Sequence, residues 1–339
     1  MERLPEVKES YRSIFDMCSW PVREKVIAAA IELNIFNVLN EPVTAEKVAE
    51  TLCTHPGNTG LFLDALTAVD LVAKKDGHYR NLPATRAFLV TESPTCLGPV
   101  IEYMLRYETF TSDKLLDLVK NGPDSSGETH TASDEMTEVE VTSHAVFEKT
   151  GKAQLIAETA ASLPEFDSCR KMLDLGCGPG LNGIAIVSAH PTMKGVSFDR
   201  PATVEFAGEM IRRYGMEYRM TTIGGDYARD AVGEGYDLLL ASDTLYYTRE
   251  EIDPIMKRIY NAMNPGGVMI AVHPCLTSER TKPGGLVLGS LFSGLKGENM
   301  GLLDRGFLAD AMLGAGFRSV RSKTVDTDWG EEDIDIGRK

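Results

Sequence analysis

The sequence predicts an α/β fold, in which a mainly parallel sheet carries helices on both faces and follows a smaller, mostly helical domain. Three observations support this prediction. Strand-like and helix-like segments alternate between Lys171 and Val272, a glycine-rich turn follows the first of these strands, and residues 1–90 read as helices and one hairpin. Alternating strands and helices are typical of a parallel sheet, because each connection must cross back over the sheet.

The bulk composition narrows the class of protein. The chain has 339 residues, of which 43% are hydrophobic, and this is enough for two globular domains. The formal net charge of −15 argues against a nucleic-acid partner, since phosphate contacts need a basic surface. No apolar run reaches the ~18 residues of a membrane span. The N-terminus also lacks the pattern of a signal peptide, so we expect a cytoplasmic protein without membrane contact.

The cysteine pattern predicts no metal site. The six cysteines are widely scattered and form no C-x-x-C pair. Neither a zinc cluster nor a disulfide framework follows from this spacing.

The first domain is expected to be a winged helix. Its predicted elements are helices over 21–39, 45–52 and 60–69 and a hairpin over 71–82. Pro21 stands near the first turn of the first helix, Thr44 can cap the second, and Asp76-Gly77 makes the hairpin turn. Residues 1–90 hold 10 Lys and Arg against 12 Asp and Glu, a net charge of −2. We therefore expect this domain to pair two subunits rather than to bind DNA.

The segment between the domains shows the clearest shift in composition. Residues 121–142 contain six acids, no Lys or Arg, and many Ser, Thr and Gly residues. A solvated loop is the simplest interpretation, and a lid over a substrate pocket is the alternative. A helix over Phe147–Leu163 is then expected to lead into the second domain.

The second domain is expected to hold the parallel sheet. Its predicted strands cover 171–175, 195–198, 218–223, 236–241 and 268–272, and its helices cover 181–189, 203–214 and 251–264. Ligands of such folds bind beyond the carboxyl ends of the strands. Asp174, Asp199, Asp226 and Ser242 all fall there.

The most informative stretch is the turn within Met172–Gly180 (MLDLGCGPG), which leads from a buried strand into a helix. Gly178-x-Gly180-x-x-Gly183 fits the dinucleotide fingerprint, with the carboxylate of Asp199 about 20 residues further on. A tight turn without any ligand is the plainest alternative.

A second cofactor, S-adenosylmethionine (AdoMet), fits the same turn. Its ammonium and carboxylate groups need a carboxylate and backbone donors, which Asp174, Gly176 and Gly178 offer. Its ribose diol needs an acid at the end of the next strand, where Asp199 lies.

Six motifs occur in a recognisable order along the chain. They are Leu173–Gly180, Gly195–Pro201 (GVSFDRP), Gly224–Tyr227 (GGDY), Tyr236–Leu240 (YDLLL), Asn264–Gly267 (NPGG) and Gly314–Phe317 (GAGF). Over nearly its whole length the chain resembles AdoMet-dependent O-methyltransferases of the plant caffeate and bacterial polyketide type. The resemblance implies an N-terminal winged-helix dimerisation domain, a C-terminal Rossmann-like domain and AdoMet as cofactor, and it speaks against the dinucleotide interpretation.

The resemblance also implies roles for the cofactor residues. Gly176 and Gly178 would let the methionine part of AdoMet pack on the backbone, and Asp174 would face its ammonium group or hold the strand end. Asp199 would accept hydrogen bonds from the ribose hydroxyls. The remaining implied cofactor residues are Arg200 and Gly225 in the same motifs, Asp226 facing the adenine amino group or capping a turn, Tyr227 packing on the adenine ring, and Ser242 at the family's lysine position.

The catalytic positions depart from the family's pattern. After the fourth strand the family carries Lys-x-x-Leu-His-Asp-Trp, where the His deprotonates the acceptor. This chain reads Ser242–Thr248 (SDTLYYT), so that Tyr246 stands in the place of the base. A tyrosine has an ordinary pKa near 10 and is a poor base at neutral pH.

His273 is the alternative base. It occupies the position after the fifth strand where the family usually carries a Glu, and Glu298 resembles the family's second acid. A histidine that titrates near neutrality can serve as base, or His273 can be a strand-end residue without chemistry. An acceptor such as a thiolate or a carbanion-like carbon would need no base at all.

We therefore expect a homodimeric AdoMet-dependent methyltransferase that moves a methyl group to an O, S or activated C atom of a small-molecule acceptor. The alternative is a relative that binds AdoMet or S-adenosylhomocysteine but has lost or repurposed methyl transfer. The expected parts are a winged-helix dimerisation domain over 1–110, an acidic loop and linker helix over 111–165, and a Rossmann-like domain over 166–339.

Overall fold

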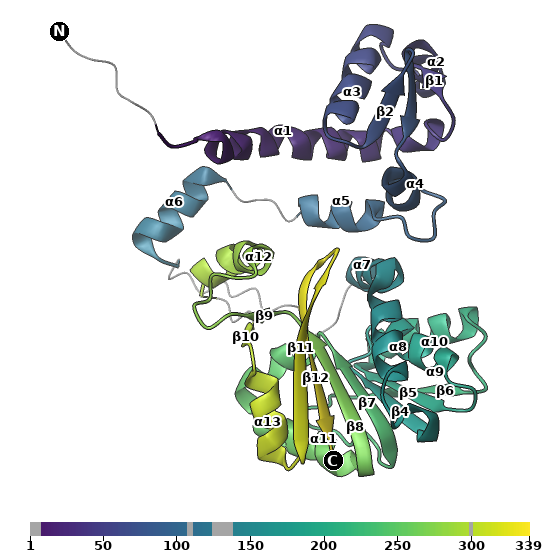
Figure 1. Cartoon of the computed structure of the whole chain (residues 1–339), viewed down its shortest axis with the longest axis vertical. Coiled ribbons are helices and arrows are strands. Elements are labelled where there is room, and N and C mark those ends of the chain that lie inside the picture. Colours follow the sequence, from purple (N-terminus) through teal and green to yellow (C-terminus); the bar gives the residue numbers. More distant parts are fainter. Residues whose placement is uncertain (1–7, 107–110, 124–137, 298–300) are drawn as a thin grey trace, which may run out of the picture. The chain divides into compact units, whose positions relative to one another are not determined.

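The computed structural model describes residues 8–106, 111–123, 138–297 and 301–339 (Figure 1). The chain divides into two compact units, residues 1–107 and 108–339, each with its own hydrophobic core. Glu298 and residues 124–137 of the acidic segment lie outside the described residues.

The N-terminal unit consists of helices and a small antiparallel sheet. Its helices are α1 (Arg12–Glu32), η1 (Ile35–Val38), α2 (Ala45–Leu52), α3 (Pro56–Ala68), α4 (Pro83–Leu89) and α5 (Gly98–Arg106), and its strands are β1 (Val43–Thr44), β2 (Val72–Lys75) and β3 (His78–Asn81). β3 lies between β1 and β2 and is antiparallel to both. The helices and the hairpin enclose a core around the fully buried Phe36, Leu63 and Leu66. The predicted hairpin and the presence of three helices are confirmed, but the first helix ends at Glu32 rather than at residue 39, because Asn34 takes a left-handed conformation and separates it from η1.

Two predicted helix starts are wrong. The first helix begins at Arg12 and continues through Pro21, which lacks the N–H that would bond to the carbonyl of Met17. Both residues are exposed, so water can satisfy that carbonyl. The third helix begins at Pro56 rather than Gly60, because the ring Nδ1 of His55 accepts the N–H of Asn58 and caps an earlier turn.

The C-terminal unit contains the large sheet. Its helices are α6 (Ser112–Asn121), α7 (Glu138–Phe147), the π-turn η2 (Glu148–Lys152), α8 (Ala153–Ala161), η3 (Phe166–Ser168), α9 (Leu181–Ala189), α10 (Pro201–Arg213), η4 (Leu245–Glu251), α11 (Ile252–Ala262), α12 (Gly284–Leu295) and α13 (Phe307–Ala315). Its strands are β4 (Lys171–Leu175), β5 (Lys194–Asp199), β6 (Met220–Gly224), β7 (Tyr236–Ser242), β8 (Met263–His273), β9 (Cys275–Leu276), β10 (Leu303–Asp304), β11 (Ser319–Thr327) and β12 (Gly330–Arg338).

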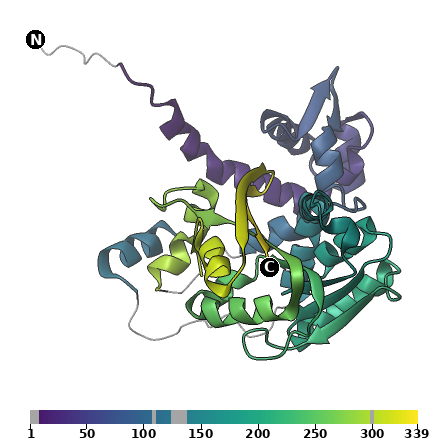
Figure 2. The ribbon, with the colours of Figure 1, turned by 60° about the horizontal axis from the view of Figure 1, so that its bottom comes forward.

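Seven strands form one sheet in the order β11-β12-β8-β7-β4-β5-β6. The five strands from β8 to β6 in this order are parallel, and β12 is antiparallel to both β8 and β11. Helices α8, α9 and α10 cover one face, and α11 and α13 cover the other (Figure 1, Figure 2). Because both faces are covered, β7 carries an unbroken apolar run, and Leu238, Leu239 and Leu240 are all fully buried. The predicted fold class is confirmed.

The structure departs from the sequence prediction at the β11–β12 hairpin and at the linker helix. The hairpin of β11 and β12 was not predicted, although it fills the edge beside β8. The predicted linker helix over 147–163 is wrong as a single helix, because it starts at Glu138 and is broken by the π-turn η2. Gly151 takes φ +133° there, which side chains rarely adopt.

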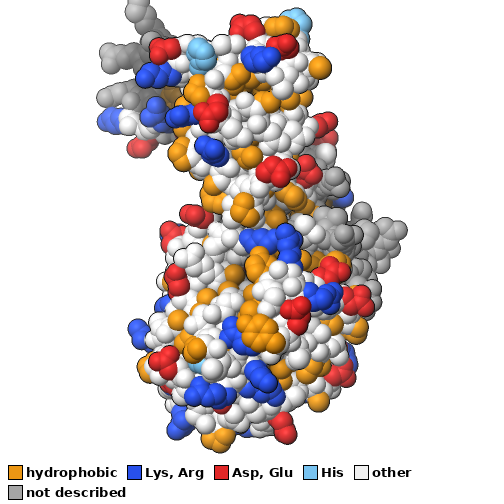
Figure 3. Space-filling model, turned by 90° about the vertical axis from the view of Figure 1, so that its right-hand side faces the viewer, with side chains coloured by type: hydrophobic (Ala, Val, Ile, Leu, Met, Phe, Trp, Pro, Cys, Tyr) orange, Lys and Arg blue, Asp and Glu red, His pale blue; other side chains and the backbone are white. Residues whose placement is uncertain are grey.

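The described surface is mixed in charge. On the face in Figure 3, acidic and basic side chains are interspersed. Across the described residues, no helix combines the length and the apolar character that crossing a bilayer requires.

Candidate cofactor and acceptor site

The glycine-rich turn after β4 brings the backbone close to β5 and to Thr244, which follows β7. Gly176, Gly178 and Gly180 have φ values of +65°, +52° and +81°, which favour glycine. The N–H of Gly176 donates to the carbonyl of Phe198 at 2.8 Å and fixes the turn to β5. A Cβ at position 176 would lie 2.0 Å from Oγ1 of Thr244, whereas one at 178 would meet nothing within 4 Å. The turn is therefore packed at Gly176 and open at Gly178.

Asp199, at the end of β5, faces this turn. Its Oδ2 accepts the N–H of Gly178 at 2.7 Å, and its Oδ1 accepts the N–H of Arg200 at 2.7 Å. A carboxylate oxygen can accept more than one hydrogen bond, so both oxygens of Asp199 can also accept from a ribose hydroxyl. Burial raises the pKa of Asp199, although the two N–H groups oppose the shift.

The first turn of α9 is occupied by carboxylates of the chain itself. Oε2 of Glu148 accepts the N–H of Leu181 at 3.0 Å, and Oδ2 of Asp174 accepts the N–H of Gly183 at 3.0 Å. A dinucleotide pyrophosphate would need these same donors and would meet two acids there. The geometry therefore fits AdoMet, which has no pyrophosphate, better than it fits NAD.

The electrostatics of this edge also fit AdoMet, whose ammonium and sulfonium groups are cationic. Burial raises the pKa of Asp174 to about 7, and burial together with the charge of Asp174 raises the pKa of Glu148 well above its ordinary value. A cationic ligand at this edge would favour the ionised carboxylates. The residues present therefore fit the cofactor.

The loop after β6 is built around Asp226 and Tyr227. Oδ1 of Asp226 accepts the N–H of Ala228 at 2.9 Å, and its carboxylate pairs with Arg229, so the turn-capping interpretation describes its contacts. The hydroxyl of Tyr227 donates to the carbonyl of Thr244 at 2.8 Å. Its neighbour Gly225 donates its N–H to the carbonyl of Asp199 at 2.9 Å. Contacts of Asp226 and Tyr227 with adenine remain a prediction.

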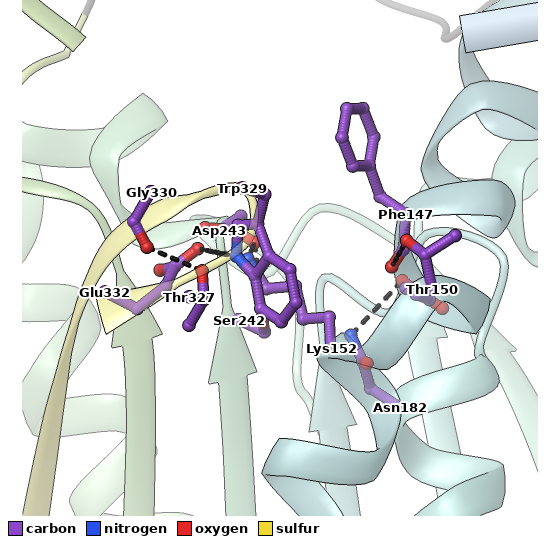
Figure 4. A network of polar contacts seen from close by, with 11 residues as sticks. Phe147, Thr150, Lys152, Asn182, Ser242, Asp243, Thr327, Trp329, Gly330 and Glu332 are labelled. Atoms are coloured by element: carbon purple, nitrogen blue, oxygen red, sulfur yellow. Dashed lines mark hydrogen bonds and ion pairs between the residues drawn. The ribbon is translucent and has the colours of Figure 1, made fainter. Parts of the chain in front are cut away.

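A buried ion cluster joins the π-turn to the sheet (Figure 4). Nζ of Lys152 lies between the carboxylates of Asp243 and Glu332, and the distance to Oε1 of Glu332 is 2.9 Å. The indole N–H of Trp329 donates to the same oxygen at 2.8 Å, and Oγ of Ser242 donates to Asp243 at 3.3 Å. Burial opposes the charge of Lys152, but the two carboxylates raise its pKa, so it stays cationic.

The two predicted catalytic residues share Asp243 as an electrostatic neighbour. Tyr246 is partly buried, and desolvation together with Tyr247 and Asp243 raises the pKa of its phenol well above the ordinary value of 10. Burial lowers the pKa of His273, while the charges of Asp335 and Asp243 oppose that shift. His273 Nε2 lies 3.8 Å from Oδ2 of Asp335, and its buried Nδ1 has no hydrogen-bond partner among the described residues.

Sequence reasoning missed several residues of this edge. They are Glu148 and Lys152 on the π-turn, Asp243 and Thr244 after β7, and Trp329 and Glu332 at the β11–β12 hairpin. The signal was weak, because each needs a partner far away in the sequence. Asp243 and Thr244 stood within the motif Ser242–Thr248 and could have been singled out.

Family models cover most of the chain. A model of the O-methyltransferase domain matches residues 121–293, and a model of the O-methyltransferase dimerisation domain matches residues 16–91. The chain belongs to the O-methyltransferase family. This confirms the predicted class of enzyme, an AdoMet-dependent methyltransferase, and the predicted cofactor.

Curated relatives of this family member act on different atoms. It is 28% identical to the N,N-dimethyltransferase OxyT of Streptomyces rimosus, over 94% of each chain. It is 25% identical to human acetylserotonin O-methyltransferase, over 81% of this chain and 83% of the relative. It is 23% identical to the L-tyrosine C(3)-methyltransferase of Streptomyces lavendulae, over 88% of this chain and 84% of the relative.

Solved structures show the same fold. Human N-acetylserotonin methyltransferase, in complex with SAM, superposes with a TM-score of 0.75 at 24% identity, over 99% of both chains. PigF, with SAH, superposes with a TM-score of 0.76 at 23% identity, over 98% of this chain and 100% of the other.

Asp199 should be essential for cofactor affinity. We expect Asp199→Asn to weaken S-adenosylhomocysteine binding by at least ~1–3 kcal/mol in calorimetry, because a buried hydrogen-bond acceptor is lost. Asp253→Asn, on the exposed side of α11, is the control and should leave the affinity unchanged. Tight binding of NAD, or an unchanged affinity of Asp199→Asn, would refute the assignment.

Cofactor affinity should rise with pH around neutrality. The pKa of Asp174 in the folded protein is about 7, above the value of an exposed carboxyl, so its ionised form is fully present only above that pH. Since a cationic ligand favours the carboxylate, we expect AdoMet affinity to increase roughly tenfold between pH 6 and pH 8. In Asp174→Asn this rise should disappear. A wild-type affinity that is flat or falls over this range would contradict the proposed contact.

Proposed function

We propose that this chain transfers the methyl group of AdoMet to an O, S or activated C atom of a small molecule, without a histidine at the family's base position. The main support is an intact cofactor edge, in which Asp199 faces the turn at Gly178, next to a loop where Tyr246 replaces the base. Because the pKa of the partly buried Tyr246 phenol is raised well above 10, it keeps its proton at neutral pH. Tyr246 would then shape the acceptor pocket and donate a hydrogen bond rather than remove a proton.

His273 is our candidate for the base. Burial lowers its pKa, so its imidazole is neutral at pH 7, and its Nδ1 is free of partners among the described residues. Asp335 beside Nε2 would hold the ring and stabilise the imidazolium that forms during transfer.

The acceptor atom is open within the family. The names of the relatives include N,N-dimethyl, O-methyl and C-methyl transfer, so nitrogen joins the atoms proposed above. An in-line displacement at the methyl group depends mainly on positioning, which can supply several kcal/mol of the barrier. One fold can therefore serve several nucleophiles when the pocket orients them.

The second candidate is a relative that binds the cofactor without methyl transfer. The loss of the histidine at position 246 supports it. The two candidates differ in one measurement, since only the first consumes AdoMet and forms S-adenosylhomocysteine in the presence of an acceptor.

We further propose a cytoplasmic homodimer paired through residues 1–110, followed by a linker over 111–165 and the methyltransferase domain over 166–339. The dimerisation-domain match supports the pairing. So does a row of apolar side chains at the start of α1 that are more than half exposed, as expected of an interaction surface. These are Tyr11, Ile14, Phe15, Met17, Trp20 and Val22.

Replacing His273 tests its role as base. We expect His273→Ala to lower kcat by ~10²-fold or more, with unchanged affinity for S-adenosylhomocysteine, because a general base contributes about this much. Tyr246→Phe should have a smaller effect, since only a hydroxyl is lost. Transfer from labelled AdoMet to a panel of phenols, thiols and amines provides the measurement.

The pH profile adds a second readout. Because its pKa is lowered, His273 should stay unprotonated to below pH 6.5, and kcat at saturating AdoMet should stay high over the same range. If His273→Ala and Tyr246→Phe both retain most of the wild-type kcat and change mainly KM, the acceptor needs no base and His273 has another role.

The dimer can be tested by replacing the apolar start of α1. Sedimentation at micromolar concentration should give a dimer for the wild type and a monomer for the double variant Ile14→Asp, Phe15→Asp. Tyr218→Asp is the matched control, because Tyr218 is 74% exposed on the other unit and should leave the dimer intact. A monomeric wild type would refute the proposal, and tight, salt-dependent binding to duplex DNA would point to a regulator instead.

A further inference from the structure

A cavity of about 410 Å³ lies within the C-terminal unit. Its lining residues come from η4, β9 and the loop after it, α12, and the segment just before β10. This volume is within the range of small-molecule sites. Its lining consists of Arg249, Leu276, Arg280, Val287, Ser290, Leu291, Gly294, Leu295, Gly301 and Leu302. Two arginines and no carboxylate are among these residues.

The body of the cavity is apolar. Val287, Leu291 and Leu295 follow each other at intervals of four residues and therefore lie along one face of α12. The helix has an apolar sequence, yet none of its residues is fully buried. Leu276, which is buried, faces the cavity from β9. An apolar or aromatic ligand body would find its partners on these walls.

One end of the cavity is cationic. Arg249 and Arg280 both pair with the carboxylate of Asp304, and Nη2 of Arg249 lies 3.1 Å from Oδ2. Two guanidinium groups thus share one carboxylate, which leaves one excess positive charge in a chain whose net charge is −15. A guanidinium has five N–H donors, and only Nη1 of Arg280 is used in its pair with Asp304, so donors remain for a ligand.

The cavity borders the loop that carries the base position. Gly301 has φ +60°, and a Cβ built on it would lie 2.2 Å from the carbonyl oxygen of Tyr246, so the two backbones are in close contact. The segment η4 supplies both Tyr246 and Arg249. A ligand held at Arg249 would therefore lie against the element that carries the position of the family's base.

We propose that this cavity binds the methyl acceptor and that the acceptor is an acidic aromatic molecule. Its ring system would pack on the apolar face of α12, and its carboxylate would accept charge-assisted hydrogen bonds from Arg280 and Arg249. The assignment of the ligand as acceptor rests on the proposed function, whereas its charge preference rests on the cavity alone.

Two probes of the same shape test the charge preference. Calorimetry with 1-naphthoate and the neutral 1-naphthalenemethanol, at saturating S-adenosylhomocysteine, should show at least a tenfold preference of the wild type for naphthoate. Arg280→Gln should abolish that preference. Asp304→Asn should strengthen naphthoate binding several-fold, because the competing carboxylate is lost. Arg305→Gln is the matched control, since Arg305 pairs with Glu331 and Asp333 and does not line the cavity.

Arg280→Gln and Asp304→Asn should change the affinity for naphthoate in opposite directions, and this difference separates ligand binding from a structural role. If Arg280 and Asp304 only hold the loop together, both variants should weaken both probes alike, and the proposal is overturned. An equal affinity of the wild type for the two probes overturns it as well. If S-adenosylhomocysteine does not bind at all, the proposed function is refuted instead. The preference for naphthoate can then still be measured with the free protein, so the two failures can be told apart.

Discussion

Carboxylates buried at the carboxyl edge of the parallel sheet need positive partners, because an ionised group loses its hydration when it leaves water. At this edge burial raises the pKa of Asp174, Glu148 and Asp199, the charge of Asp199 raises that of Asp174 further, and the charge of Asp174 raises that of Glu148 further. Backbone N–H groups donate hydrogen bonds to Asp199, Glu148 and Asp174 and so replace part of the lost hydration. The cationic groups of AdoMet can compensate the negative charge further, which links the charge of this edge to the choice of cofactor.

The π-turn η2 connects this edge to the acceptor side. Glu148 at its start holds the first turn of α9, and Lys152 at its end holds Asp243 and Glu332. Gly151 between them allows the close approach of Trp329, whose Cζ3 would lie 3.3 Å from a Cβ at that position. One short turn therefore fixes the cofactor loop, the end of β7 and the β11–β12 hairpin relative to one another. π-turns of this kind are frequent at functional sites.

The sequence was informative where local chemistry decides the structure. The glycines at 176, 178 and 180 and the acid at 199 could be predicted, because a strand, a tight turn and a helix follow each other along the chain. The strand β12 could not be predicted in this way. Its residues Glu332, Asp333 and Asp335 are buried acids that read as a surface segment until Lys152, Arg305 and Ser322 are brought to them by the fold. The π-turn was hidden for the same reason, since a helical pattern runs through it and only tertiary contacts break it.

A crystal structure with S-adenosylhomocysteine bound tests the central claim most directly. We predict the ribose hydroxyls at the carboxylate of Asp199, the methionine part over the open face of Gly178, and the sulfur beside the loop that begins at Ser242. A sulfur more than ~10 Å from both Tyr246 and His273 would contradict the account, because a base must reach the acceptor proton directly or through one water.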